Sequence, residues 1–436
     1  MIENAGLKIL IVSEHASTKF GGEAILPWHY FRFLSDRGID VRMIVHERTR
    51  KELLAQLPPG FDDSRICFIK DTWLNQLMWT LQRFLPSQVS YITVGWISRL
   101  QTQFTAKCVA KRLIEEHGIN IVHQPIPVSP REPSMLHDLG APVVIGPMNG
   151  NMTYPAGFAI GSKLRASSTI TSVGRKLTDI LNWLIPGKLR AEVLLVANDR
   201  TRQAIPVLAS GQIISLVENG VDLSLWLKPS SKCEPGAPVR FTFVGRLVDW
   251  KRVDLLIAAF REVSSTSPPL LTILGDGPMR KQLERQARLV GIADRVTFLG
   301  WKSQQECAQH LRESDALVLP SIFECGGAVV LEAMACGLPV IATDWGGPAD
   351  YLDDTCGVLI KPDSEIGLQQ GFATAMGRLA SDPQLRESLG NAGRERVEQL
   401  FDWGVKIDQM ISVYRELVPH DVSPATATCH SALLEK

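Results

Sequence analysis

The chain has 436 residues, of which 45% are hydrophobic and 21% are charged. This is the composition of an ordinary globular protein, and the length favours two domains of about 200 residues each. The 46 Lys and Arg residues balance the 46 Asp and Glu residues, so charge gives no argument for a nucleic-acid partner.

The first half of the chain alternates strand-like and helix-like segments. Residues 7–12 predict a buried strand, a loop with Gly21 and Gly22 follows, and a helix-like stretch then runs to about Asp36. Further strands are predicted at 41–45, 119–123, 143–145 and 193–197.

Two segments of the first half could contact a membrane or a lipid acceptor. Residues 72–107 carry the aromatic residues Trp73, Trp79, Phe84, Tyr91, Trp96 and Phe104. We expect a helical hairpin whose aromatics pack into the first domain, and the alternative is a membrane-facing surface. The stretch 172–190 offers a second surface of that kind, because Leu and Trp residues lie among Arg175, Lys176, Lys188 and Arg190.

The second half repeats the alternation after a proline- and glycine-bearing link at 228–238. Its predicted strands are 240–244, 270–274, 296–299, 316–319, 339–342 and 357–360. The alternation predicts two doubly wound parallel sheets. In such sheets ligands bind beyond the carboxyl ends of the strands, so we expect a cleft between two facing domains.

Cysteines and apolar runs bear on the compartment. The eight cysteines form no CxxC pair, so neither a zinc site nor a thioredoxin-type site is indicated. Scattered thiols favour a reducing compartment. The first residues lack the basic start and long apolar core of a signal peptide, and no apolar run approaches the roughly 18 residues that cross a bilayer. The sequence therefore predicts a cytoplasmic protein, with peripheral contact to the inner face of the membrane as an option.

Two cations follow the strand at 240–244. Arg246 stands at the carboxyl end of the strand, and Lys251 comes five residues later near the next helix. Both side chains can reach one anion in the cleft, although a solvated loop is the alternative. The turn Leu-Gly-Asp-Gly-Pro at 274–278 also ends a strand, and its Gly275 permits a close approach to a ligand or simply makes a turn.

The most informative stretch is 316–348. A predicted strand leads into a loop with Glu324 and the pair Gly326–Gly327, and the helix-like segment that follows carries Glu332. Backbone N–H groups at such a helix N-terminus favour an anion, and a carboxylate on each side can hold hydroxyl groups. A solvated helix face is the usual alternative, but the apolar neighbours of Glu332 argue against it, because a carboxylate there needs a partner. A nucleotide sugar fits these features.

The motifs in this order resemble glycosyltransferase family four. They are Gly-Gly near the first strand, Arg-Leu-x-x-x-Lys, Gly-Asp-Gly-Pro and Glu-x7-Glu-Ala-Met-Ala, and the resemblance is strongest over 240–360. It implies the two-domain GT-B fold and a retaining transfer of a sugar from a UDP- or GDP-linked donor. The acceptor would be a hydroxyl of a glycan or a lipid-linked acceptor, in polysaccharide or glycoconjugate synthesis.

The resemblance also implies an organisation of the chain. The implied segments are an N-terminal acceptor-side domain over 1–225, a nucleotide-sugar-binding domain over 226–405, and a closing helix over 406–420 that returns to the first domain. A tail over 421–436, rich in Ser, Thr and Ala, is expected to be disordered.

The resemblance assigns roles to residues of the second domain. Arg246 and Lys251 match the cations that hold the donor diphosphate, together with amides near Gly326 and Gly327. Glu324 matches the acid that contacts hydroxyls of the transferred sugar. In this assignment the departing phosphate oxygen takes the acceptor proton.

Three further residues complete the assigned site. Glu332 matches the acid that binds the ribose hydroxyls, and Gly22 matches a glycine that approaches the phosphates from the first domain. His123 stands where many members keep a histidine near the reacting carbon, and a structural hydrogen-bonding histidine is the alternative. The chain has no Asp-x-Asp sequence, so we expect no metal and no other cofactor.

The sequence departs from the family pattern at three positions. Gly326 stands where an aromatic residue is usual, which would open the sugar pocket or loosen its loop. Arg252 replaces a common glycine, and Asp350 stands where a glutamate is frequent.

Three rival functions share this architecture or this ligand. A nucleotide-sugar epimerase on the same fold and a non-catalytic nucleotide-sugar-binding subunit remain alternatives. A two-domain dehydrogenase is disfavoured, because no G-x-G-x-x-G follows the first strand.

Overall fold

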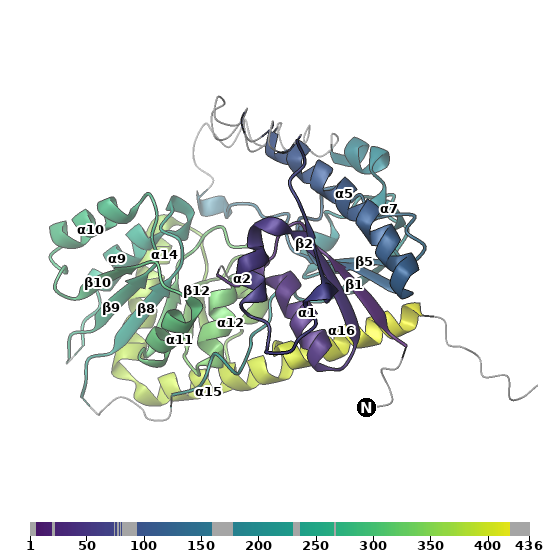
Figure 1. Cartoon of the computed structure of the whole chain (residues 1–436). Coiled ribbons are helices and arrows are strands. Elements are labelled where there is room, and N and C mark those ends of the chain that lie inside the picture. The colour runs from purple at the N-terminus through teal and green to yellow at the C-terminus, as the bar shows by residue number, and fades with distance from the viewer. Residues whose placement is uncertain are drawn as a thin grey trace, which may run out of the picture.

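The computed structural model describes residues 6–19, 22–73, 75, 78, 80, 94–158, 178–229, 236–265 and 267–418, with only the backbone at 94–97. The described chain forms two α/β lobes, each built on one parallel sheet (Figure 1). The predicted fold class is therefore confirmed. The predicted tail over 421–436 lies outside the described residues.

The first sheet has seven strands in the order β3-β2-β1-β4-β5-β6-β7. The strands are β1 (Lys8–Val12), β2 (Asp40–His46), β3 (Ile66–Ile69), β4 (Ile121–Gln124), β5 (Val143–Met148), β6 (Val193–Val196) and β7 (Gln212–Ser215). Its helices are η1 (Gly22–Ile25), α1 (Leu26–Asp36), η2 (Glu47–Thr49), α2 (Arg50–Leu54), η3 (Asp63–Arg65), α5 (Val94–His117), η4 (Ala156–Phe158), α7 (Gly187–Arg190) and α8 (Asp199–Arg202).

The second sheet has six strands in the order β10-β9-β8-β11-β12-β13. The strands are β8 (Arg240–Val244), β9 (Leu270–Leu274), β10 (Val296–Gly300), β11 (Ala316–Leu319), β12 (Val340–Thr343) and β13 (Gly357–Ile360). Its helices are η5 (Asp249–Lys251), α9 (Val253–Arg261), α10 (Arg280–Leu289), α11 (Gln304–Arg312), α12 (Ala328–Ala335), α13 (Gly347–Tyr351), α14 (Glu365–Ser381) and α15 (Pro383–Leu400).

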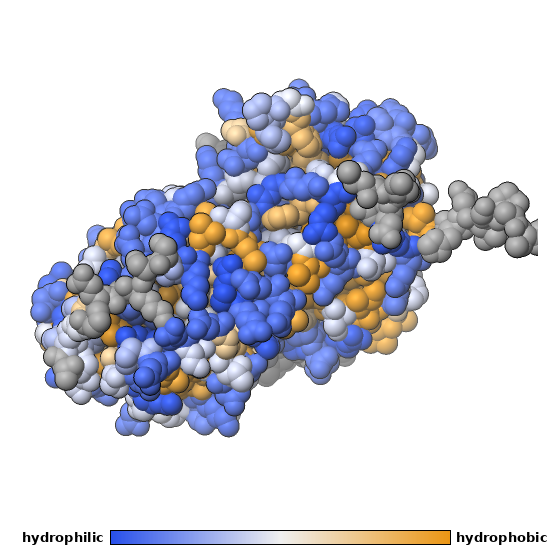
Figure 2. Space-filling model, turned by 90° about the horizontal axis from the view of Figure 1, so that it is seen from below, coloured by the Kyte–Doolittle hydropathy of each residue, from blue (hydrophilic) through white to orange (hydrophobic). Residues whose placement is uncertain are grey.

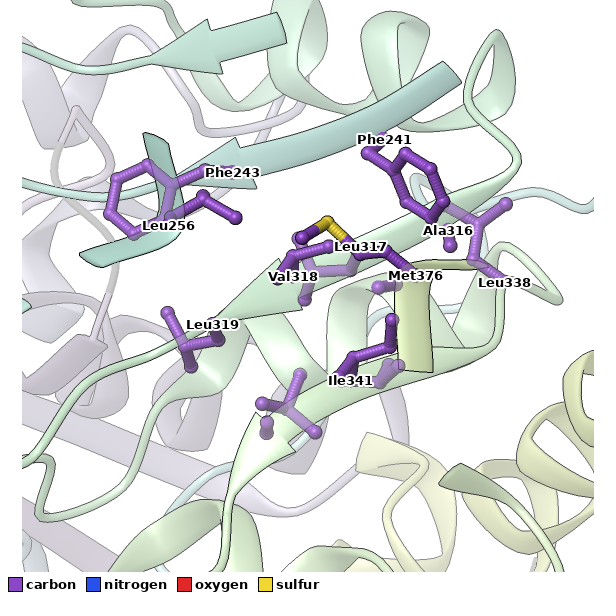
Figure 3. Packing of buried hydrophobic residues seen from close by; sticks show 14 of the residues in the cluster. Phe241, Phe243, Leu256, Ala316, Leu317, Val318, Leu319, Leu338, Ile341 and Met376 are labelled. Atoms are coloured by element: carbon purple, nitrogen blue, oxygen red, sulfur yellow. The ribbon is translucent and has the colours of Figure 1, made fainter. Parts of the chain in front are cut away.

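The strands at the middle of each sheet are almost wholly apolar because helices cover both faces of a parallel sheet. In the second lobe, Phe241 and Phe243 of β8 and Leu317 of β11 are fully buried. Figure 3 shows them packed with Leu256 of α9 and Met376 of α14 around the central strands. This core fixes the strand ends from which the site loops emerge.

A long pair of helices at the end of the chain joins the two lobes. Helix α15 packs on α12 and α14 of the second lobe, and α16 (Trp403–Leu417) continues along the first lobe (Figure 1). The side chains of Trp403, Ile407 and Tyr414 lie in the core of the first sheet. The segment boundaries predicted at 225/226 and 405/406 stay predictions.

Two strands were not predicted from the sequence. Both β3 and β7 are four-residue strands at the edges of the first sheet, and β7 has no buried residue. The sequence of β7 has only two apolar residues, because an edge strand with one neighbour is partly exposed. The sequence of β3, ICFI, is apolar throughout but short.

The predicted packing of the aromatic segment is wrong for the two residues that can be checked. The Trp73 side chain is 75% exposed and that of Phe104 is 57% exposed. Trp79, Phe84 and Tyr91 lie outside the described residues, as does the Trp96 side chain. On the face shown in Figure 2, hydrophobic residues form small patches among hydrophilic ones, which is ordinary for a protein surface.

Lys188 also differs from the prediction, because it cannot take part in a basic membrane surface. Its side chain is buried, and its Nζ donates a hydrogen bond to the carbonyl of Ser129. Burial lowers the pKa of Lys188 to about 7. Arg190 is exposed but forms an ion pair with Asp138 at 2.6 Å, and Arg175 and Lys176 lie outside the described residues.

Candidate functional site

A cleft of about 890 Å³ lies where the loops of the two lobes meet. From the first lobe it is lined by loops after β1 and β5 and by the link that follows β7, and from the second lobe by loops after β8, β9, β10 and β11. Eight of the nine predicted site residues line it, namely Gly22, Arg246, Lys251, Gly275, Glu324, Gly326, Gly327 and Glu332. Residues that are up to 310 positions apart in the sequence are thus brought together, at the carboxyl ends of the strands.

The two predicted cations differ in their surroundings. Arg246 is exposed in the cleft and has no carboxylate partner within the described part of the chain. Lys251 ends the short helix η5, and its Nζ forms an ion pair with the carboxylate of Glu324. The side chains of Lys251 and Glu324 are 14% and 16% exposed. The pair lies at the cleft wall, where little water screens it.

Gly275 is required by the protein backbone itself. Its φ is +134°, and a Cβ atom there would lie 1.9 Å from the carbonyl oxygen of Gly245. The close approach that the sequence suggested is therefore made by the neighbouring loop. Gly275 also lines the cleft, so the turn brings main chain rather than a side chain to its surface.

The loop after β11 presents the N-terminus of α12 to the cleft. Gly327 takes a φ of +80° as the residue before the helix, which non-glycine residues rarely adopt. Ala328 and Val329, in the first turn, line the cleft. The N–H groups of a first turn lack intrahelical partners and carry the positive end of the helix dipole, so this wall suits an anion.

Glu332 lies one turn further along α12 and also lines the cleft. Burial raises the pKa of its carboxyl to about 7. The structure gives this carboxylate no hydrogen-bond partner among the described residues. A largely buried acceptor without a partner is costly, and donors from a bound molecule would relieve that cost.

The turn that carries Glu324 is held by hydrogen bonds to its backbone. The Gly347 N–H donates to the carbonyl of Glu324 at 2.8 Å. The Asn149 Nδ2 and the Arg200 guanidinium, both from the first lobe, donate to the carbonyl of Cys325 at 2.9 and 3.0 Å. The first lobe therefore helps to fix a loop of the second.

Asp350 takes part in the same arrangement. It accepts hydrogen bonds from Arg200 at 2.7 Å and from Asn198 at 3.0 Å. Asp350, which stands where the family frequently has a glutamate, therefore connects the two lobes, because its carboxylate is paired with a cation of the first lobe.

His123 is the one predicted site residue that the structure does not bring to the cleft. It is fully buried, with its Nε2 2.6 Å from the Gly146 carbonyl and its Nδ1 2.7 Å from the Tyr414 hydroxyl. Burial lowers its pKa to about 4. Both ring nitrogens are engaged, so the geometry favours the alternative of a structural histidine that joins β4 to β5 and α16.

Several residues of the cleft were missed by sequence reasoning. Glu23, Asn149, Glu218 and Trp301 line it. Asn149 directly follows β5 and Trp301 directly follows β10, so their positions at strand ends were the available signal. Glu218 lies in a connecting segment with no such signal.

Neither a metal cluster nor a membrane span is found among the residues that the structure describes. No three His, Cys, Asp or Glu side chains there gather closely enough to ligate an ion. No helix in the described ranges is both long and apolar enough to cross a bilayer. The expectation that no metal or cofactor is needed stays a prediction.

Comparison with known proteins bears on the second lobe in particular. The family described as "Glycosyl transferases group 1" matches residues 228–396. The glycogen synthase of Mycobacterium tuberculosis H37Rv is 32% identical over 203 residues, which is 46% of this chain and 48% of that protein. The D-inositol 3-phosphate glycosyltransferase of Rhodococcus erythropolis PR4 is 32% identical over 243 residues, 49% of this chain and 52% of that protein. The match thus spans about half the length of these curated relatives.

Solved structures match over both lobes. Sucrose-phosphate synthase from Thermosynechococcus elongatus aligns with a TM-score of 0.60 at 20% identity, covering 94% of this chain and 99% of that one. The Anabaena protein HepE in complex with UDP-glucose aligns with a TM-score of 0.62 at 18% identity, covering 94% and 100%. At such identities the likeness establishes the fold. Residues 228–396, which make up most of the second lobe, match the group 1 glycosyltransferases, and the whole chain has the two-lobed GT-B fold of these solved structures.

Proposed function

We propose that the chain is a retaining glycosyltransferase that moves a sugar from a nucleotide diphosphate donor to a hydroxyl of a glycan or lipid-linked acceptor. Polysaccharide or glycoconjugate synthesis is the corresponding process. One observation carries the proposal: Arg246, Lys251, Glu324, Glu332 and the first turn of α12 surround a single cleft between the lobes. Of the two predicted kinds of donor, UDP-linked and GDP-linked sugars, we favour the UDP-linked kind because HepE was solved with UDP-glucose.

In the proposed reaction the donor diphosphate lies against the positive wall of the cleft. Negative charge builds on the diphosphate as the glycosidic bond breaks. Arg246, Lys251 and the N–H groups at the start of α12 would stabilise this charge from fixed positions, which is the most effective form of electrostatic catalysis. The departing phosphate oxygen would take the acceptor proton, so retention needs no further base.

The carboxylates would hold the hydroxyl groups of the donor. Glu332 faces the cleft, has no hydrogen-bond partner among the residues that the structure describes, and suits the ribose. Glu324 suits the transferred sugar, and binding of the donor must rearrange its ion pair with Lys251. Approach of the two lobes would exclude water and limit hydrolysis of the donor.

A panel of UDP- and GDP-linked sugars tests the proposed function. Calorimetry should detect binding of at least one donor, and NMR should detect its slow hydrolysis with the α or β configuration retained. An epimerised donor in place of hydrolysis products would favour the epimerase. Binding with neither hydrolysis nor transfer to added acceptors would favour the binding subunit.

Glu332 should make the stability of the unliganded protein depend on pH. Its pKa is raised from 4.5 to about 7, so the folded chain holds the extra proton between these values. Stability therefore falls as pH rises through this window, and the cost persists above it. At pH 8 the variant E332Q is expected to have a larger free energy of unfolding than the wild type. At pH 4.5 most of this difference should disappear.

Urea denaturation at the two pH values measures this difference. E115Q is the matched control, because Glu115 is an exposed residue of α5 outside the cleft. An E332Q effect that is the same at both pH values would contradict the assigned ionisation.

Peripheral contact with a membrane also remains a proposal. The helical segment 178–184 exposes Ile180 and Trp183, and Leu184 beside them, at 54%, 66% and 60%. These side chains are three and four residues apart, so they share one helix face. Flotation with anionic vesicles should recover the protein, and failure to float at low salt would contradict the contact.

A further inference from the structure

Glu218 is an acidic residue of the cleft to which the proposed function gives no role. It lies in the link between the lobes and is 5% exposed. Its Oε1 accepts hydrogen bonds from the Nδ2 of Asn149 at 2.7 Å and the Nδ2 of Asn219 at 2.8 Å. Its Oε2 is buried and has no hydrogen-bond partner within the described ranges. A carboxylate is therefore kept in a costly place beside the site.

The position of this carboxylate explains why residue 326 is a glycine. A Cβ atom on Gly326 would lie 2.3 Å from Glu218 Oε1 and 2.3 Å from Asn219 Nδ2. The φ of Gly326 is outside the left-handed region, so its backbone does not itself demand glycine. The requirement comes from the two side chains of the link.

Glu218 also reaches the neighbouring residue of the same turn. The Asn149 amide that donates to Glu218 donates to the carbonyl of Cys325 as well, at 2.9 Å. Glu218 thus restrains the turn at two adjacent residues, by direct contact at Gly326 and through Asn149 at Cys325. Glu324, the residue before them, projects from this turn toward Lys251.

The link itself is held from its other side by Lys406 of α16. This lysine is buried, and its Nζ donates to the carbonyls of Val217 and Asn219. Burial raises the pKa of Glu218 and lowers that of Lys406, and each charge opposes the shift of the other. The backbone on either side of Glu218 is therefore held by Lys406, and the Glu218 carboxylate is held by Asn149 and Asn219.

We propose that Glu218 is a positioning residue for the donor sugar. Its carboxylate occupies the space of the side chain that Gly326 lacks, and so fixes where Glu324 meets the transferred sugar. This inference rests on the proposed function. It replaces the expectation that Gly326 opens the sugar pocket, because the space beside Gly326 is filled by Glu218 and Asn219.

A double-mutant cycle between Glu218 and Gly326 tests the inference. The variants are G326A, E218A and the double variant, and the matched control is G377A, since a Cβ on Gly377 of α14 would meet nothing within 4 Å. The dissociation constants of UDP-glucose and UDP-galactose are measured for the wild type and for each variant. If the protein binds GDP-linked sugars, the corresponding GDP-linked pair is used. G326A should weaken donor binding by about tenfold, and the same change in the E218A background by about threefold or less.

The ratio of the two dissociation constants separates positioning from mere stability. A shift of the turn alters how Glu324 meets epimeric hydroxyls, so G326A should change the ratio by at least about threefold. The double variant should bring it back toward the wild-type value, and G377A should leave it unchanged. The conservative variant E218Q keeps an acceptor oxygen and should stay near wild type.

Two outcomes would overturn the inference. One is an equal G326A effect with and without Glu218, and the other is a loss of affinity that leaves the ratio of the two donors unchanged. A wild-type chain that binds no donor would instead contradict the proposed function, and this inference with it. Thermal unfolding of each variant identifies those that do not fold, and if E218A is one of them, E218S takes its place in the cycle because it also vacates the space beside Gly326.

Discussion

Replacing Lys251 by alanine is expected to lower turnover of the donor by about a hundredfold or more, comparable to the loss of one oxyanion donor. The substitution removes a cation from the wall of the cleft against which we propose the donor diphosphate lies. It also leaves the Glu324 carboxylate, which is 16% exposed, without its ion-pair partner. An unpaired carboxylate beside the diphosphate repels it, so the two effects act in the same direction.

Steady-state hydrolysis or transfer with the donor from the panel measures this loss. The control is K281A, which removes an exposed lysine of α10 outside the cleft and should leave turnover within about twofold of the wild type. Thermal unfolding shows whether K251A is folded. Near-normal turnover in a folded K251A protein would refute the role of Lys251.

The sequence predicted the fold well wherever the strands are buried. The six strands of the second sheet and the five central strands of the first were each located to within a few residues. Strands with helices on both faces must be apolar throughout, and such runs are easily seen. The edge strands β10 and β13 of the second sheet were located as well, so an edge position alone does not hide a strand. Of the two strands that were missed, β7 has no buried residue, and β3 is apolar but only four residues long.

The sequence predicted correctly that site residues that follow strands would lie close together. Arg246 is the second residue after β8 and Gly275 comes directly after β9, so the topology of a parallel sheet places both at the same edge. For His123 the sequence left a site residue and a structural histidine as alternatives, and the geometry favours the second. This histidine is the third of the four residues of β4, and the hydrogen bonds that hold it in the core join segments that are far apart in sequence.

Contacts between the lobes lay beyond sequence reasoning. The turn at Cys325 is held by Asn149 and Arg200 of the first lobe and adjoins Glu218 of the link. Such contacts depend on how two independently folded sheets are docked, and no periodicity or motif spacing records that. The sequence of the second lobe thus predicts which residues line the cleft, whereas contacts from the first lobe help to hold these residues in position.

Replacing Glu324 by glutamine is expected to act in opposite directions on binding and on turnover. In the unliganded cleft the Glu324 carboxylate neutralises Lys251, so a diphosphate must compete with it for the ammonium group. Two unit charges 4 Å apart interact with roughly 4 kcal/mol at an effective dielectric near 20. Relief of only part of this interaction should tighten the binding of free UDP, or of GDP, by about tenfold.

Turnover of E324Q should fall by about a hundredfold. The amide is a poorer acceptor for the hydroxyls of the transferred sugar, and it no longer offsets the positive charge that develops at the reacting carbon. Calorimetry with the free nucleoside diphosphate and hydrolysis of the donor measure the two effects on one protein preparation. The matched control E115Q removes an exposed carboxylate of α5 and should change neither.

This pairing of effects is specific to an acid that both restrains the diphosphate-binding lysine and contacts the sugar. A glutamate that only supports the fold would lose affinity and turnover together when replaced. Weaker binding of UDP by a folded E324Q protein would show that the Lys251–Glu324 pair does not compete with the donor. Tighter binding with lost turnover would mean that the unliganded cleft holds its lysine in check until a sugar-bearing diphosphate replaces the carboxylate as its partner.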